Sequence, residues 1–162
     1  SRIQLFGAGV ALPGKVVGGP IRSYSSALAT GTTAMVFDDT IPQNTEGEQY
    51  LSIAYAPTSS ANALEIDADL NASSSASGNI AGALFQDTTA NALAAKTANC
   101  QAATGYGNIK FTHLMLAGTT SSTTFKVRAG GTGGTLTVNG ASGGRLFGGV
   151  MSSALYVKEI QA

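Results

Sequence analysis

Short segments of alternating apolar and polar residues recur along this chain. The clearest is ALEIDADLN, residues 63–71, in which apolar residues at the even positions alternate with acidic or polar residues at most odd positions. Successive side chains of a β-strand point to opposite faces, so this pattern predicts a strand with one buried face and one solvated face. The segments LSIAY, residues 51–55, and FKVRA, residues 125–129, repeat the pattern.

Other segments have strand composition and are bounded by Gly, Asn, Ser, Thr or Pro. They are residues 23–27, 34–37, 80–85, 109–116, 135–138 and 154–160. Residues 88–99, TTANALAAKTAN, allow a helical turn, because Ala and Leu favour helix, but we favour a strand pair or a loop. Short strands without a βαβ rhythm predict an all-β, antiparallel β-sandwich, and a jelly-roll-like pair of sheets suits the chain length.

The first residues differ from the rest of the chain. In residues 1–22, Gly and Pro interrupt short apolar clusters. Two interpretations stay open, an irregular N-terminal extension that docks onto another part or a neighbouring chain, or an irregular first strand. We divide the chain into this segment and a β-sandwich knob domain, residues 23–162. Near the other end, the glycine-rich residues 129–149 contain Asn139-Gly140, a pair that tight hairpins prefer, and predict a hairpin there.

Composition restricts the classes of function. Charged residues make up 11% of the 162 residues and the formal net charge is zero, whereas an ordinary globular domain has about 25% charged residues. A surface this poor in ions is tolerated when part of it is buried against identical chains, so we expect an oligomer. The scattered basic residues argue against nucleic-acid binding. No window approaches the about 18 continuous apolar residues of a membrane span, so membrane insertion is not expected.

Reactive residues give only weak patterns. GASGG, residues 140–144, matches the G-x-S-x-G of a nucleophile elbow, and His113 and Asp87 would complete a triad with Ser142. An elbow requires a helix after the serine, whereas the following RLFGGVMSS is a poor helix, and nothing in the sequence selects the partners. We favour a hairpin turn at Ser142 and a structural histidine, and we predict no catalytic residues.

Metal and cofactor sites have no better support. One His and one Cys cannot build a zinc tetrad. Asp38, Asp39, Glu46 and Glu48 could gather around calcium but lack the EF-hand spacing, so a solvated loop is favoured. The glycine-rich run lacks the G-x-x-x-x-G-K-[ST] of a phosphate-binding loop. We predict neither a metal nor a cofactor.

Two charged stripes face solvent in the predicted strands. Glu65, Asp67 and Asp69 are the outward residues of one strand, and Lys126 and Arg128 are those of another. Opposite charges on adjacent strands stabilise a sheet by roughly 0.2–1 kcal/mol a pair. We predict that the stripes are neighbours in one sheet or meet across a subunit interface. The alternative is that both are simply solvated.

Several longer runs together resemble a known family. They are DDTIPQNTEGEQYLSIAYAPTSSANALEIDADL, GALFQDTTANALAA, FTHLMLAGTTSSTTFKVRAG and NGASGGRLFGGVMSSALYVKEI. In this order they resemble a domain found at or near the carboxyl end of bacteriophage tail-fibre and related virion proteins. The resemblance covers residues 24–160, and its pieces are spread over the whole predicted domain.

The resemblance implies a location in the virion and a role as a fibre or spike knob. It implies a homotrimer with a β-sandwich body that adheres to the host surface, commonly to a glycan or an outer-membrane component. Contacts with other virion proteins would then be made through residues 1–22. The resemblance supplies no catalytic residues.

Polar loop residues and tyrosines suit the recognition of neutral sugars. The receptor-binding candidates are Gln43, Asn44, Thr45, Tyr106, Asn108 and Asn139. Three of them lie in TIPQNTEG, residues 40–47, where Pro42 denies a ladder donor and Gly47 frees the backbone before the next strand. These features predict a structural corner between strands more than a receptor contact.

Two other functions stay open. A head-fibre, decoration or collar protein would serve virion assembly without binding a receptor. A polysaccharide depolymerase would need paired carboxylates roughly 5–10 Å apart, for which Asp38 with Glu46, or Asp87, are the candidates. The long repetitive rungs of many tailspikes are absent, and we expect a protein that is not an enzyme.

Overall fold

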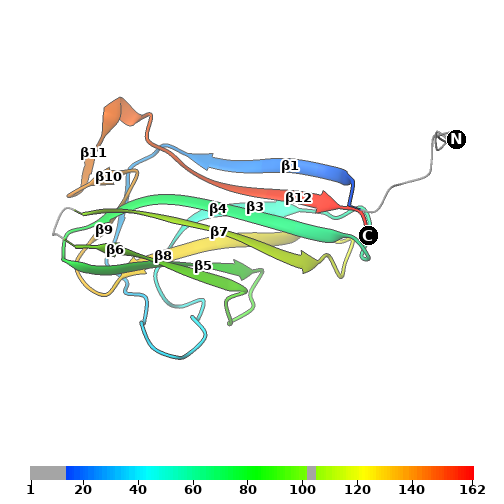
Figure 1. The fold of residues 1–162 in the computed structure, drawn as a ribbon, viewed down its shortest axis with the longest axis horizontal. Helices are drawn as coiled ribbons and strands as arrows, with labels where there is room; N and C mark the ends of the chain where they lie inside the picture. The colour runs from blue at the N-terminus through cyan, green and yellow to red at the C-terminus, as the bar shows by residue number, and fades with distance from the viewer. Residues whose placement is uncertain (1–13, 102–104) are drawn as a thin grey trace, which may run out of the picture.

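The computed structural model describes residues 14–101 and 105–162, and these residues form two large antiparallel sheets packed face to face and a small two-stranded one (Figure 1). Within this part of the chain the helical content is one 3-10 turn, Phe147–Gly149. The predicted all-β, antiparallel class is confirmed.

The long strands are divided between the two sheets. In sheet I the order is β1 (Val16–Ser25), β12 (Ser153–Ile160), β4 (Ala63–Ser74) and β7 (Tyr106–Leu116). In sheet II it is β3 (Glu48–Tyr55), β8 (Thr123–Gly131), β5 (Gly78–Gln86) and β6 (Ala94–Cys100). Two short strands, β9 (Leu136–Val138) and β2 (Ala29–Gly31), extend sheet I. Two others, β10 (Gly140–Ala141) and β11 (Gly144–Arg145), form a separate hairpin.

The strand order is that of a jelly roll. When the eight long strands of the described residues are numbered along the chain, sheet I reads 1-8-3-6 and sheet II reads 2-7-4-5. The first strand therefore pairs with the eighth, the second with the seventh, the third with the sixth and the fourth with the fifth, which is the nested pairing of a jelly roll. The predicted jelly-roll-like sandwich is thus confirmed in its topology.

The main core lies between the sheets. From β4, Leu64, Ile66 and Leu70 are fully buried, and they face Phe125 and Val127 of β8. Burying a side chain of this size contributes about 1.5–3 kcal/mol relative to leaving it exposed. The period-two pattern of residues 63–71 and 125–129 therefore correctly predicted which faces are buried.

A second, smaller core lies on the other face of sheet II. Met35 packs there against Ala83 and Phe85 of β5. The predicted strand at residues 34–37 does not form, because these residues leave the sheet and cover it. Their backbone is bound by the neighbouring loop instead of a ladder: Gly47 N donates to Ala34 O (3.0 Å), and Val36 N donates to the Glu46 carboxylate (2.8 Å).

Strand β1 crosses the boundary predicted at residues 22 and 23. It pairs with β12 from Val16 to Ser25, with register shifts on either side of Gly18. Bulges and a proline suit an edge strand, because they discourage pairing with another chain. The described part of the N-terminal segment thus follows the irregular-first-strand interpretation, while residues 1–13 lie outside the described residues.

Two local predictions shift along the chain. Of residues 88–99, the part from Ala94 forms strand β6 and not a helical turn. The tight hairpin turn occurs at Ser142-Gly143, between β10 and β11, where φ is 49° and 74°. Both central residues of a type I′ turn need positive φ, which this pair satisfies. Asn139 has positive φ as predicted, but the next residue begins β10 and does not complete the turn.

Candidate functional site

The candidates in residues 40–47 are engaged in holding a corner. The Gln43 side chain donates to Ile41 O (2.6 Å) and to Asn91 Oδ1 (3.0 Å). The Asn44 side chain donates to Thr88 O and Thr89 O, whereas Thr45 is exposed. The amides of this loop thus bind the loop that follows β5, as expected for a structural corner.

Two charged side chains complete this corner. The Glu46 carboxylate accepts hydrogen bonds from Gln43 N (2.9 Å) and Val36 N (2.8 Å). The Arg128 guanidinium, projecting from β8, donates to Glu46 O (2.8 Å) and Gly47 O (2.6 Å). Arg128 therefore anchors a loop to sheet II.

Asn139 is buried and belongs to the interior. Its Nδ2 donates to Ser25 O and Ala27 O, both at 3.0 Å, and its Oδ1 accepts from Ser153 Oγ (2.8 Å). The residue joins the end of β1 to the start of β12, and its side chain offers no surface to a receptor.

Replacing Asn139 is expected to separate two contributions to stability. Asn139→Gly keeps the positive φ of 58° but removes the side-chain hydrogen bonds, so unfolding free energy should fall by about 2 kcal/mol. Asn139→Ala should lose about 1 kcal/mol more, because a Cβ is strained in this conformation. Urea denaturation of the three proteins tests the order. If the Gly and Ala variants are equally stable, the positive φ plays no part.

The three residues considered as a catalytic triad lie on separate parts of the fold. Ser142 is in the β10–β11 turn, His113 is on β7 of sheet I, and Asp87 follows β5 of sheet II. The Asp87 carboxylate accepts hydrogen bonds from Thr123 Oγ1 (2.7 Å) and Thr124 N (2.7 Å). The preference for a hairpin turn at Ser142 is confirmed.

Within residues 14–101 and 105–162, no three His, Cys, Asp or Glu side chains come together as a metal site. In the same part of the chain, no helix has the length and apolar character needed to cross a bilayer.

The two charged stripes lie on different sheets. Glu65, Asp67 and Asp69 belong to β4 in sheet I, whereas Lys126 and Arg128 belong to β8 in sheet II. The prediction that the stripes are neighbours in one sheet is therefore wrong, because β4 and β8 do not pair. The proposal that they meet across a subunit interface is left as a proposal.

The acidic stripe has basic partners from its own sheet. Lys158 of β12 forms ion pairs with Glu65 and with Asp67, the latter at 3.7 Å, and Lys110 of β7 forms one with Asp69, also at 3.7 Å. Hydrogen bonding to Glu65 raises the pKa of Lys158. Positive and negative charges therefore alternate across the outer face of sheet I.

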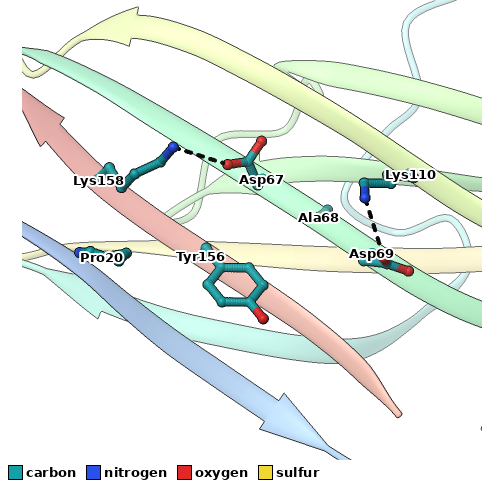
Figure 2. Close-up of a pocket in the computed structure, with 7 residues that line it drawn as sticks. All are labelled: Pro20, Asp67, Ala68, Asp69, Lys110, Tyr156 and Lys158. Atoms are coloured by element: carbon teal, nitrogen blue, oxygen red, sulfur yellow. Dashed lines mark ion pairs between the residues drawn. The ribbon is translucent and has the colours of Figure 1, made fainter. Parts of the chain in front are cut away.

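This outer face contains an open groove of about 440 Å³. We call it the outer groove, and its lining is Pro20, Asp67, Ala68, Asp69, Lys110, Tyr156 and Lys158 (Figure 2). The sheet register assembles it, since β4 lies between β12 and β7. Tyr156 pairs with Asp67 and Lys110 pairs with Asp69.

Two of the predicted receptor residues lie on the same face, beyond the outer groove. Tyr106 and Asn108 are exposed outward residues of β7. Asn108 Nδ2 donates to Asp69 Oδ1 (2.6 Å) and to Asn71 Oδ1 (3.0 Å), so it holds one of the groove carboxylates in place. Of the six candidates, Asn108 is thus the one in direct contact with the groove.

The aromatic ring and both ammonium groups of the outer groove, those of Tyr156, Lys158 and Lys110, were not predicted from the sequence. Each occupies an outward position of a strand, and that alternation is visible in the sequence. Bringing them together requires the order β12-β4-β7, which joins segments far apart in the chain.

Comparisons with known proteins identify no family. No protein-family model and no curated protein matches the sequence. Among solved structures, dimeric latent PorU from Porphyromonas gingivalis is similar with a TM-score of 0.45 and 6% identity, over 93% of this chain. The infectious bursal disease virus Gt strain structure is similar with a TM-score of 0.43 and 14% identity, over all of this chain. The chain spans only 14% and 42% of those chains, and similarities of this size carry no information about function.

Proposed function

We propose that this chain is a structural protein of a bacteriophage virion, a knob at the tip of a fibre that attaches to the host surface. The outer groove is the observation that carries the proposal, because it places an aromatic ring among four charged side chains on the outer face of sheet I. Concave sites with a few convergent polar groups are the usual sites of ligand binding. The resemblance of residues 24–160 to tail-fibre domains agrees with this role.

The knob is proposed to be a homotrimer. Large apolar side chains are exposed on the isolated chain, among them Leu114 (63%), Leu116 (68%), Phe147 (74%) and Val150 (78%). Exposed apolar surface of this kind commonly marks contacts between proteins, and the low charge of the chain points the same way.

The proposed role is binding and not catalysis. The side chains considered above as a catalytic triad lie on three separate elements of the fold. The carboxylates of the outer groove are each engaged by hydrogen bonds, Asp67 by Thr112 and Asp69 by Asn108. These contacts support a fixed recognition surface.

The purified chain is expected to block adsorption of the phage that encodes it when it is added to host cells first. Light scattering should give the mass of three chains, as proposed from the exposed apolar side chains. Three linked sites would bind a surface far more tightly than one. Adsorption is measured by counting free phage against chain concentration. A denatured sample of the same chain is the control. Unchanged adsorption at saturating concentrations of the folded trimer would contradict the proposed function.

A further inference from the structure

Both ion pairs that line the outer groove are held open. The Lys158 Nζ to Asp67 Oδ2 distance and the Lys110 Nζ to Asp69 Oδ2 distance are each 3.7 Å (Figure 2). A direct N–H···O hydrogen bond spans 2.7–3.2 Å. The second carboxylate oxygen of each aspartate is occupied, by Thr112 and by Asn108 respectively. Each pair therefore presents one ammonium and one carboxylate oxygen that do not hydrogen-bond directly to each other, and the Lys158 ammonium also pairs with Glu65.

A hydroxyl group placed beside such a pair can hydrogen-bond to both of its members. It donates one hydrogen bond to the carboxylate oxygen and accepts one from the ammonium, so both of its functions are satisfied at once. Hydrogen bonds in which one partner is ionised are about twice as strong as neutral ones. Two such pairs in one groove favour a ligand that carries at least two hydroxyls.

The groove also offers an apolar surface between these pairs. Figure 2 shows the Tyr156 ring between Lys158 and Asp69 along the sheet, on the outer face of β12. In the same view Pro20 of β1 lies to the left of the ring, below Lys158. Aromatic rings present a large apolar face, and the C–H face of a pyranose ring is a complementary surface for it.

The charges of the four ionised side chains that line the groove cancel. Asp67 and Asp69 carry two negative charges and Lys110 and Lys158 carry two positive charges, while Glu65, outside the lining, also pairs with Lys158. A carboxylate or an ammonium on the ligand would meet a charge of its own sign within the groove, and would lose hydration on entering. A neutral ligand meets no charge of its own sign and loses less hydration than an ion does.

We propose that the outer groove binds a neutral pyranose unit of a surface saccharide. Its hydroxyls bridge the Lys158–Asp67 and Lys110–Asp69 pairs, and its ring lies against Tyr156. This inference rests on the proposed adhesion to a host surface and specifies the chemical class of the receptor.

The test is a titration of the ¹⁵N-labelled chain with methyl glucoside, methyl galactoside and methyl mannoside, followed by amide chemical shifts. Glucuronate and glucosamine are the charged probes. At least one neutral glycoside should shift amides of β4, β7 and β12 with a Kd on the order of 1 mM, as for small ligands with few contacts. The charged probes should bind at least about tenfold more weakly.

Variants locate the site. Tyr156→Ala and Lys110→Ala should each weaken binding by about tenfold, since each removes one contact. Tyr156→Phe keeps the ring and should bind as the unchanged chain does. Lys96→Ala removes an exposed lysine of β6, on the other sheet, and is the matched control for Lys110→Ala. Circular dichroism confirms that every variant is folded.

The outcomes separate this inference from the proposed function. If no neutral glycoside binds, if a charged probe binds as tightly, or if Tyr156→Ala binds normally, the saccharide assignment is overturned. If the chain still blocks phage adsorption, the adhesion role survives that result. If the chain neither blocks phage adsorption nor binds a glycoside, both are overturned.

Discussion

Replacing Glu159 by glutamine is expected to lower the free energy of unfolding by about 3 kcal/mol. Glu159 is fully buried near the end of β12. Its carboxylate accepts hydrogen bonds from Tyr55 Oη (2.8 Å), Thr58 N (2.9 Å), Thr58 Oγ1 (2.8 Å), Ser59 N (3.2 Å) and Asn62 Nδ2 (2.6 Å). An amide would turn a donor toward these donors, and part of the cluster would be left unsatisfied.

The stabilisation that the Glu159 carboxylate provides should also depend on pH. Burial by itself raises the pKa of Glu159, but the hydrogen bonds from Thr58, Asn62 and Tyr55 outweigh it and hold the pKa at about 2. In the unfolded chain the carboxyl has its ordinary pKa of 4.5. The stabilisation is therefore complete above pH 4.5 and is lost as the pH falls toward 2. The difference between Glu159→Gln and the unchanged chain should shrink over the same range.

Urea denaturation at pH 7 and at pH 3 measures both effects. Glu65→Gln is the matched control, because Glu65 forms a partly exposed ion pair whose loss should cost under about 1 kcal/mol. A difference between the Glu159 variant and the unchanged chain that is the same at both pH values would show that the carboxylate charge is not what stabilises the cluster.

Adding one methyl group at Gly47 is expected to destabilise the fold by about 3 kcal/mol or more. Gly47 has φ of 60°, a conformation in which a side chain is strained. A Cβ there would lie 2.6 Å from Ala129 O and 2.8 Å from Met35 Sδ. Because Ala129 is paired in β8, its carbonyl cannot move without disturbing sheet II.

Thermal and urea denaturation of Gly47→Ala measure this cost. Gly133→Ala is the control, because a Cβ at Gly133 meets nothing within 4 Å and its stability should change by under about 0.5 kcal/mol. Equal stability of the two variants would mean that the corner of residues 40–47 relaxes freely around an added methyl. That result would contradict its structural role.

The strands could be predicted from the sequence where buried and exposed residues alternate with period two. Residues 63–71 of β4 and residues 125–129 of β8 each face the core on one side only, so their alternation is strong. The segment 34–37 has equally suitable composition, but Met35 is buried on top of sheet II and not in a strand. The local pattern indicates that a residue is buried, but it does not indicate whether a strand or a loop buries it. The strand predicted at residues 34–37 is therefore wrong.

The outer groove was harder to predict from the sequence than the strands were, for a different reason. Asp67 and Asp69 were predicted as outward acids, and this is correct. Their partners Lys158 and Lys110 come from strands about 40 to 90 residues further along the chain, and nothing local selects them. The hairpin turn shows the same limit on a smaller scale. Asn139 has the positive φ expected of a turn residue, but its side chain forms buried hydrogen bonds and the turn itself lies at Ser142-Gly143.

The pairing of β1 with β12 has a consequence for how the domain is made. Val16 pairs with Ile160, and the two strands lie side by side in Figure 1. Sheet I therefore cannot be completed until β12 is available, and the central strand β4 lacks one neighbour until then. Contacts between residues so distant along the chain make folding slow, because loop closure precedes the favourable contacts. A nascent chain that ends before β12 would expose the edge of β4, the part of the fold most open to aggregation and to chaperone binding.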